Sequence, residues 1–311
     1  MRRSPRRPPP ANFPRVKPFR VLLAYLAAVF LGAAALAPWV YLAAQRLAPG
    51  SGLTHQPFHR YVHRCLLALA LLGLWPLVRA MGLKSWAEIG WKPRPTWLRE
   101  IGSGIGLGLL SLALATVTAL VFGGRVWRAD HTAAEWAWHL ASAAGTAIFV
   151  GCLEELLFRG AVFSALHRTT SFAFATAVSS GVYALVHFFE KPAPPASVDA
   201  FTGFVVLGQM LRGFTDLHEL IPGFLTLTLA GGLLAWARER TGALWLGTGL
   251  HAGWIFWLKS YGFLTEAAPS ATTALWGTAK LYDGWAALAV LSLVAVALRR
   301  RWRIQSTASA A

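Results

Sequence analysis

The stretch GCLEELLFRG, residues 151–160, determines how the rest of the chain is interpreted. It places two adjacent carboxylates, Glu154 and Glu155, and the guanidinium of Arg159 inside an apolar segment long enough to cross a bilayer. A charged side chain at membrane depth costs at least about 2.5 kcal/mol, so ionisable residues there indicate a functional site. Glu155 and Arg159 are spaced i and i+4, so they share one helix face and are predicted to pair. Glu154, rotated by about 100° from Glu155, remains free to face a cavity or a water molecule.

The composition is that of a membrane protein. Of the 311 residues, 56% are hydrophobic and only 14% are charged, and the mean hydropathy is +0.49. These values exclude an ordinary soluble domain and predict an all-α polytopic membrane bundle. The formal net charge is +16, but the basic residues gather between apolar segments. We therefore expect membrane lipids with anionic head groups as partners, and no nucleic acid.

Eight apolar segments of the sequence are each near the length of about 20 residues that a membrane-crossing helix requires. The fourth is longer than a span needs, so we expect it to tilt or protrude. A further apolar stretch, residues 201–211, is too short to span and is predicted to be re-entrant or interfacial. The predicted spans are residues 20–44, 61–81, 101–122, 134–166, 172–189, 221–237, 243–261 and 284–298.

Lys and Arg are more frequent in alternate connections between these segments, which predicts that both termini are cytoplasmic and that the number of spans is even. Residues 1–19, rich in Arg and Pro, are predicted to form a disordered basic cytoplasmic arm. Residues 20–300 are predicted to form one integral membrane bundle, followed by a cytoplasmic tail, residues 301–311. We expect the protein in the bacterial inner (plasma) membrane.

Two histidines lie inside other apolar spans: His187 in GVYALVHFF and His251 in GTGLHAGWIFW. A single buried histidine is more often structural than catalytic. Two of them and the unpaired Glu154, on three spans of one bundle, favour a shared site, because polar groups in a bilayer must find one another or water. A Glu/His/His set can activate a water for attack on a peptide carbonyl, either as a general-base pair or around a metal.

Three motifs resemble those of the CPBP family, the CAAX-protease and bacteriocin-processing (Abi-type) intramembrane proteases. GCLEELLFRG resembles its EExxxR motif, YALVH its second motif and LHAGW its third, in the family's order, over roughly residues 145–260. The resemblance implies an eight-helix bundle in which Glu154 and His187 activate the water and His251 stabilises the oxyanion. It implies that Glu155 and Arg159 form a structural pair.

The resemblance leaves the catalytic type open, because members of this family have been described both as glutamic proteases and as metalloproteases. If a metal is bound, Zn is the expected ion, and Glu154, His187 and His251 are its expected ligands. The sequence favours the metal-free version, since no further carboxylate is evident that would hydrogen-bond to the metal-binding side chains.

One position departs from the family pattern. The third motif usually has Asn or Asp four residues after its histidine, but Ile255 stands there and can neither donate nor accept a hydrogen bond. Trp254, with an indole N–H near the same helix face, is a candidate site-supporting residue. The alternative for Trp254 is a core-facing or lipid-facing aromatic.

The predicted function is therefore an intramembrane endopeptidase. Helix rise places the candidate residues in the middle and outer half of the bilayer, which favours cleavage near the C-terminal anchor of a membrane-tethered or exported protein. The first alternative is a catalytically weak or inactive scaffold or immunity-type relative, which Ile255 supports. The second is a proton-linked transporter that uses the Glu/His set as a relay, against which the missing inverted repeat argues.

Overall fold

The computed structural model describes residues 18–128, 130–269 and 271–308, and the chain is almost entirely helical. A π-helix, η1 (Glu155–Phe163), joins α4 to α5, and short 3-10 helices, η2 (Val186–Phe188) and η3 (Leu211–Phe214), follow α6 and α7. The two strands are β1 (Arg125–Trp127) and β2 (Thr265–Ala267). The α-helices are α1 (Pro18–Leu47), α2 (Phe58–Ala80), α3 (Trp97–Val121), α4 (Ala133–Glu154), α5 (Ser164–Thr169), α6 (Phe172–Leu185), α7 (Thr202–Met210), α8 (Leu217–Thr241), α9 (Trp245–Leu264), α10 (Thr273–Trp276) and α11 (Trp285–Ala308).

The predicted all-α class is confirmed, and every predicted span coincides with helix. Within the described part of the chain, five helices are long and apolar enough to cross a membrane: α1, α2, α3, the continuous helix Ala133–Thr169, and α8. The helix Phe172–Phe188 is apolar but shorter. The helices α9 and α11, which were also predicted to span, are not among those five, so the number of eight crossings stays a prediction.

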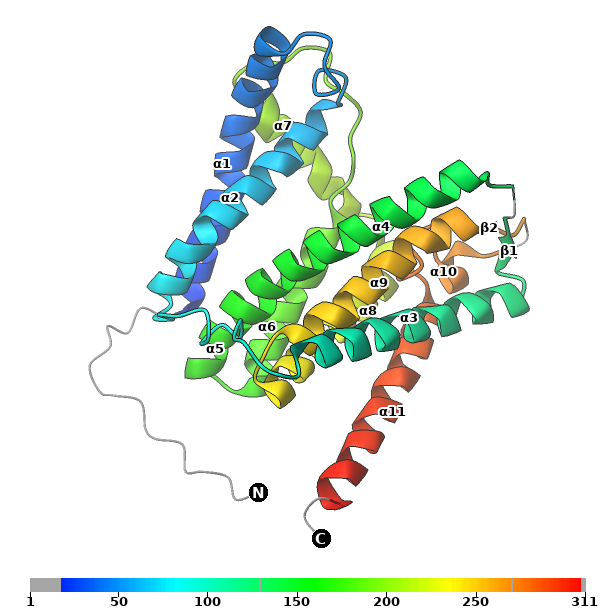
Figure 1. The fold of residues 1–311 in the computed structure, drawn as a ribbon. Helices are drawn as coiled ribbons and strands as arrows, with labels where there is room; N and C mark the ends of the chain where they lie inside the picture. Colours follow the sequence, from blue (N-terminus) through cyan, green and yellow to red (C-terminus); the bar gives the residue numbers. More distant parts are fainter. Residues whose placement is uncertain (1–17, 129, 270, 309–311) are drawn as a thin grey trace.

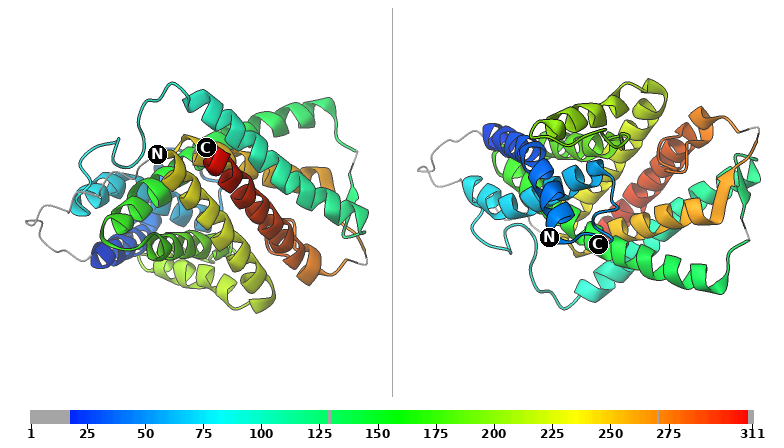
Figure 2. Two further views of the ribbon diagram at one scale, coloured as in Figure 1. Left: turned by 90° about the horizontal axis from the view of Figure 1, so that it is seen from below. Right: turned by 90° about the horizontal axis from the view of Figure 1, so that it is seen from above.

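The helices form two groups around the motif segment. One group packs α1 against α2 and α7, and in the other α9 lies between α3 and α4 (Figure 1). The helix α6 packs on α8, while α11 contacts both α3 and α8. Figure 2 shows α1 and α2 at one side of the molecule and α3 and α9 at the other. A buried apolar cluster that includes Leu22, Leu77 and Phe163 joins the first group to η1.

The first and last described segments and the short apolar stretch 201–211 are all helical. Of the predicted arm, residues 1–17 lie outside the described residues, and Pro18 already begins α1. The last helix, α11, continues to Ala308, beyond the predicted end of the final span at residue 298. The stretch 201–211 forms the nine-residue helix α7, which packs against α1 and α2.

Two local features depart from the expected simple helices. The strands β1 and β2 pair in antiparallel register and tie the α3–α4 connection to the end of α9. Buried Arg125 supports this pairing by donating hydrogen bonds to the Thr265 hydroxyl at 3.1 Å and to its carbonyl at 2.8 Å. The long fourth span changes from α-helix to π-helix at Glu155. π-Helical turns are rare and occur frequently at functional sites, so this change of winding marks the motif segment.

The contact between α3 and α9 depends on glycines that let the two backbones approach closely. A Cβ on Gly249 would clash with the carbonyl of Ile101, and one on Gly253 would lie 2.6 Å from the carbonyl oxygen of Ile105. Small residues at such crossings are what allows tight helix packing in membranes. The tight crossing positions His251 against α4.

We expect Gly249→Ala to lower the free energy of unfolding by about 1–3 kcal/mol, because backbone atoms of α3 cannot move aside as a flexible side chain would. Thermal unfolding in detergent, followed by tryptophan fluorescence, measures this change. Gly145→Ala on α4 is the matched control, since an added Cβ there meets no atom within 4 Å. Equal unfolding temperatures for the two variants would contradict the prediction.

Candidate active site

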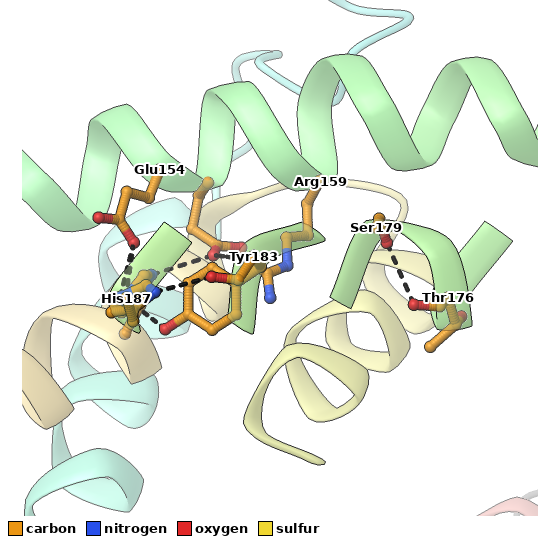
Figure 3. Close-up of polar contacts among 8 residues, drawn as sticks. Glu154, Arg159, Thr176, Ser179, Tyr183 and His187 are labelled. Carbon is orange, nitrogen blue, oxygen red and sulfur yellow. Dashed lines mark hydrogen bonds and ion pairs between the residues drawn. The ribbon is translucent and has the colours of Figure 1, made fainter. Parts of the chain in front are cut away.

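The predicted site residues converge from three parts of the fold. Glu154 ends α4 and Glu155 begins η1, His187 lies in η2 after α6, and His251 lies in α9. Glu154 points toward His187 (Figure 3), with 4.0 Å between Glu154 Oε2 and His187 Nε2. His251 Nε2 lies 3.5 Å from the same oxygen. The three candidates that the sequence placed on separate spans therefore form one cluster.

Glu155 and Arg159 form the ion pair that their spacing predicts, with 3.0 Å between Arg159 Nη1 and Glu155 Oε1. Both residues are fully buried. The same carboxylate oxygen lies 3.1 Å from His251 Nδ1, so Glu155 also orients the imidazole. The Arg159 guanidinium stacks 4.5 Å from the centre of the Tyr183 ring (Figure 3). The Glu155–Arg159 pair thus links two turns of its own helix and also holds His251 and Tyr183 in place at the site.

The hydrogen bonds assign the tautomers of both histidines. His187 Nδ1–H donates to the carbonyl of Tyr183 at 2.7 Å, which leaves Nε2 as an acceptor that faces Glu154. His251 Nδ1–H donates to the Glu155 carboxylate, which leaves Nε2 to accept from the Tyr183 hydroxyl at 3.3 Å. Each ring is fixed by the nitrogen that points away from Glu154.

Glu154 differs from the other members of the cluster. Its Oε2 is buried and has no hydrogen-bond partner among the described residues. It faces His187 Nε2, another acceptor, at 4.0 Å, which is too long for a direct hydrogen bond. A molecule that donates to both atoms, as water does, fits this separation. The arrangement is therefore suited to holding a water between a carboxylate and an imidazole.

Two cavities meet at Glu154. The first, of about 100 Å³, lies at the cluster and is lined by Glu154, Tyr183, His187, His251, Ile255 and Tyr282, among others. The second, of about 250 Å³, is an apolar cleft between α1 and α2 on one side and α4, η1 and α6 on the other. Because Glu154 lines both, an apolar chain in the cleft would lie directly beside the polar cluster.

A family model described as "Type II CAAX prenyl endopeptidase Rce1-like" matches residues 135–257. The resemblance to the CAAX-protease family is confirmed. The matched range contains all three motifs and extends from the first turn of α4 into α9. Residues 135–257 are thus similar to the CAAX-type intramembrane endopeptidases, and the five apolar helices are those of an integral membrane protein. No curated protein and no solved structure matches the chain.

Glu154, His187 and His251 are the residues expected to bind a metal ion if the protein uses one. Within the ranges that the structure describes, no group of three or more His, Cys, Asp and Glu side chains is arranged to hold a metal ion. Glu154, His187 and His251, the ligands expected if a metal binds, are not among such groups, although the Nε2 atoms of His187 and His251 lie 4.0 and 3.5 Å from Glu154 Oε2.

Trp254 lines the cavity, but its indole N–H is committed elsewhere. It donates to the hydroxyl of Ser111 on α3 at 2.9 Å, so Trp254 serves as a wall rather than as a donor to the site. Ile255 also lines the cavity and contributes no polar atom. The structure therefore leaves unfilled the donor position that the CAAX-protease motif normally provides four residues after His251.

Two tyrosines of the cavity were not among the predicted site residues. Tyr183 belongs to the quoted YALVH motif and lies one helical turn before His187, a spacing that could have identified it. Tyr282 lies in the connection between α10 and α11, outside the matched range, and its sequence surroundings carry no motif.

Proposed function

We propose that the protein is an intramembrane endopeptidase in which Glu154 and His187 activate the attacking water. The observation that carries this proposal is that Glu154 Oε2 has no hydrogen-bond partner among the described residues and lies 4.0 Å from the acceptor nitrogen of His187. A water between them donates one hydrogen to each, and its oxygen lone pair is left to face the cavity. A positioned general base of this kind contributes about 10²–10⁴-fold to a rate.

The chemistry follows from these positions. The water oxygen bonds to the carbonyl carbon as its proton passes to Glu154, and the carbonyl π electrons move onto the oxygen to give a tetrahedral oxyanion. Collapse of that intermediate breaks the C–N bond, and Glu154 returns the proton to the leaving amine. His251 can stabilise the oxyanion only when both of its nitrogens carry hydrogen, because Nδ1–H already donates to Glu155.

The apolar cleft beside Glu154 supports a substrate embedded in the membrane. Its wall consists of aliphatic and aromatic side chains from α1, α2, α4 and α6, with His63 as a further polar residue. A volume of about 250 Å³ is too small for a second helix, which with its side chains is about 10–12 Å across. The cleft fits an unwound apolar segment, as expected next to the C-terminal anchor of a tethered or exported protein.

The location of the protein is also part of this proposal. The distribution of Lys and Arg supports both termini in the cytoplasm of a bacterial cell, with the protein in the plasma membrane. Helix rise supports a site in the middle and outer half of the bilayer.

The test uses the purified full chain in proteoliposomes with a reporter whose C-terminal membrane anchor follows the candidate cleavage segment. We expect cleavage of the anchored reporter, located by mass spectrometry, and much slower cleavage of the same segment as a soluble peptide. Activity that persists in 1,10-phenanthroline supports the metal-free mechanism, whereas loss that added Zn²⁺ restores supports a metalloenzyme. No cleavage of any anchored reporter would favour the inactive scaffold, for which Ile255 is the supporting observation.

A further inference from the structure

The cavity is short of hydrogen-bond donors for an oxyanion. The position that usually supplies one holds Ile255, and the indole N–H of Trp254 donates to Ser111 instead. His251 Nδ1–H is bonded to Glu155, and the Tyr183 hydroxyl lies 3.3 Å from His251 Nε2. A tetrahedral intermediate formed at this site needs a donor from another element.

Among the described residues, Tyr282 is a further hydroxyl residue that lines this cavity. It lines the same cavity as Glu154, His187 and His251, and packs against the apolar cluster that includes Tyr183. In the described ranges, its hydroxyl makes no hydrogen bond. Thr226, the third hydroxyl residue of the lining besides Tyr183 and Tyr282, donates to the carbonyl of Pro222 within its own helix.

The turn that carries Tyr282 is held in an unusual conformation. Leu281 has φ +63°, and throughout the described chain no other residue except glycine has a positive φ. Such a conformation is disfavoured for a bulky residue, and it persists only where the surroundings fix it. Leu281 is 2% exposed in an apolar cluster that includes residues of α3, α8, α9 and α11. The strained residue therefore directly precedes Tyr282, which lines the cavity.

Polar contacts close the turn on its other side. The buried carboxylate of Asp283 accepts hydrogen bonds from the Thr278 backbone N–H at 2.9 Å and from the Thr278 hydroxyl at 2.5 Å. Gly277, at φ +74°, leaves no space for a Cβ, which would lie 2.5 Å from an Asp283 carboxylate oxygen. Contacts on both sides of Tyr282 thus hold the backbone of the turn that places it at the cavity wall.

We propose that Tyr282 is a catalytic residue that donates a hydrogen bond to the oxyanion of the tetrahedral intermediate, in the role that Ile255 cannot fill. The inference rests on the proposed endopeptidase function. Burial raises the pKa of the Tyr282 hydroxyl above its usual range, so the group remains protonated and able to donate. The bond strengthens as negative charge develops on the carbonyl oxygen, so it stabilises the transition state more than the bound substrate.

The experiment measures kcat and KM for the anchored reporter with wild type, Tyr282→Phe, Ile255→Asn and the double variant, in proteoliposomes. Phe keeps the ring and its packing, so we expect Tyr282→Phe to fold normally and to lower kcat by about 10²–10³-fold, with KM nearly unchanged. Ile255→Asn places an amide donor on the cavity wall and is expected to restore much of the rate in the Tyr282→Phe background. A merely structural role for Tyr282 would not give that rescue.

Tyr261→Phe is the matched control. Tyr261 is fully buried and its hydroxyl has no partner among the described residues, but it packs on Arg125, away from the cavity. We expect this variant to cleave at the wild-type rate. If Tyr282→Phe also cleaves at that rate while Glu154→Gln is inactive, Tyr282 is not the donor and the endopeptidase function stands. If wild type and Glu154→Gln give the same result, the proposed function fails and the donor role fails with it.

Discussion

Glu154→Gln is expected to lower the rate of cleavage of an anchored reporter by about 10²–10⁴-fold, because the amide cannot take the proton of the attacking water. The substitution keeps the size of the side chain. Since Glu154 Oε2 has no partner within the described residues, no hydrogen bond of the fold depends on its charge. We therefore expect an unchanged unfolding temperature and unchanged expression. Product formation in proteoliposomes at matched protein amounts measures the effect.

Glu266→Gln is the control for this comparison, because Glu266 is an exposed carboxylate on β2, outside the cluster. It is expected to cleave at the wild-type rate. Combining Glu154→Gln with His187→Ala should lower the rate little further than either change alone, since the two residues hold one water and act as a unit. The water-activating pair would be contradicted if the rate losses of the two single variants multiplied in the double variant. Cleavage by Glu154→Gln at the wild-type rate would also contradict it.

Both the helices and the Glu154–His187–His251 cluster could be predicted from the long apolar runs of the sequence. Long apolar runs specify membrane-crossing helices, and charged residues within such runs are rare enough to mark a site. The spacing of Glu155 and Arg159 predicted their ion pair, because it depends only on local helix geometry. The partner of Glu155 across the bundle, His251, is 96 positions away, and its contact depends on how closely α4 approaches α9. The motifs suggested that Glu155 is structural, but they did not show that it orients a histidine.

Features that depend on tertiary packing left little trace in the sequence. The sequence of η1 is as apolar as that of a membrane α-helix. Composition therefore does not distinguish a π-helix from an α-helix in this segment. The strands β1 and β2 are three residues each, and their pairing joins two connections far apart in the chain. In the sequence, Tyr282 resembles an ordinary interfacial tyrosine. Only the fold of the turn shows that it lines the cavity. The sequence revealed the missing donor at Ile255 but not which residue faces the same space.

Arg159→Ala is expected to lower the free energy of unfolding by about 3–5 kcal/mol, because it leaves the Glu155 carboxylate buried without its counter-charge. Arg159 and Glu155 are both fully buried and 3.0 Å apart, so solvent cannot replace the lost partner. Unfolding by heat in detergent, with helical circular dichroism as the signal, measures the change. Arg168→Ala is the control, because Arg168 pairs with Glu88 at 3.0 Å but both side chains are 40% exposed or more. An exposed pair contributes about 0–1 kcal/mol.

A double substitution separates the pair's contribution to stability from its contribution to the site. Removing both charges, as in Glu155→Leu with Arg159→Met, leaves no uncompensated buried ion, and apolar replacement of a buried pair is often neutral for stability. We therefore expect the double variant to recover most of the stability that Arg159→Ala loses. Cleavage should remain low, because His251 Nδ1–H then has no carboxylate to orient it. Recovery of both stability and cleavage would show that Glu155 serves the fold alone, whereas recovery of stability without cleavage would assign it the orientation of His251.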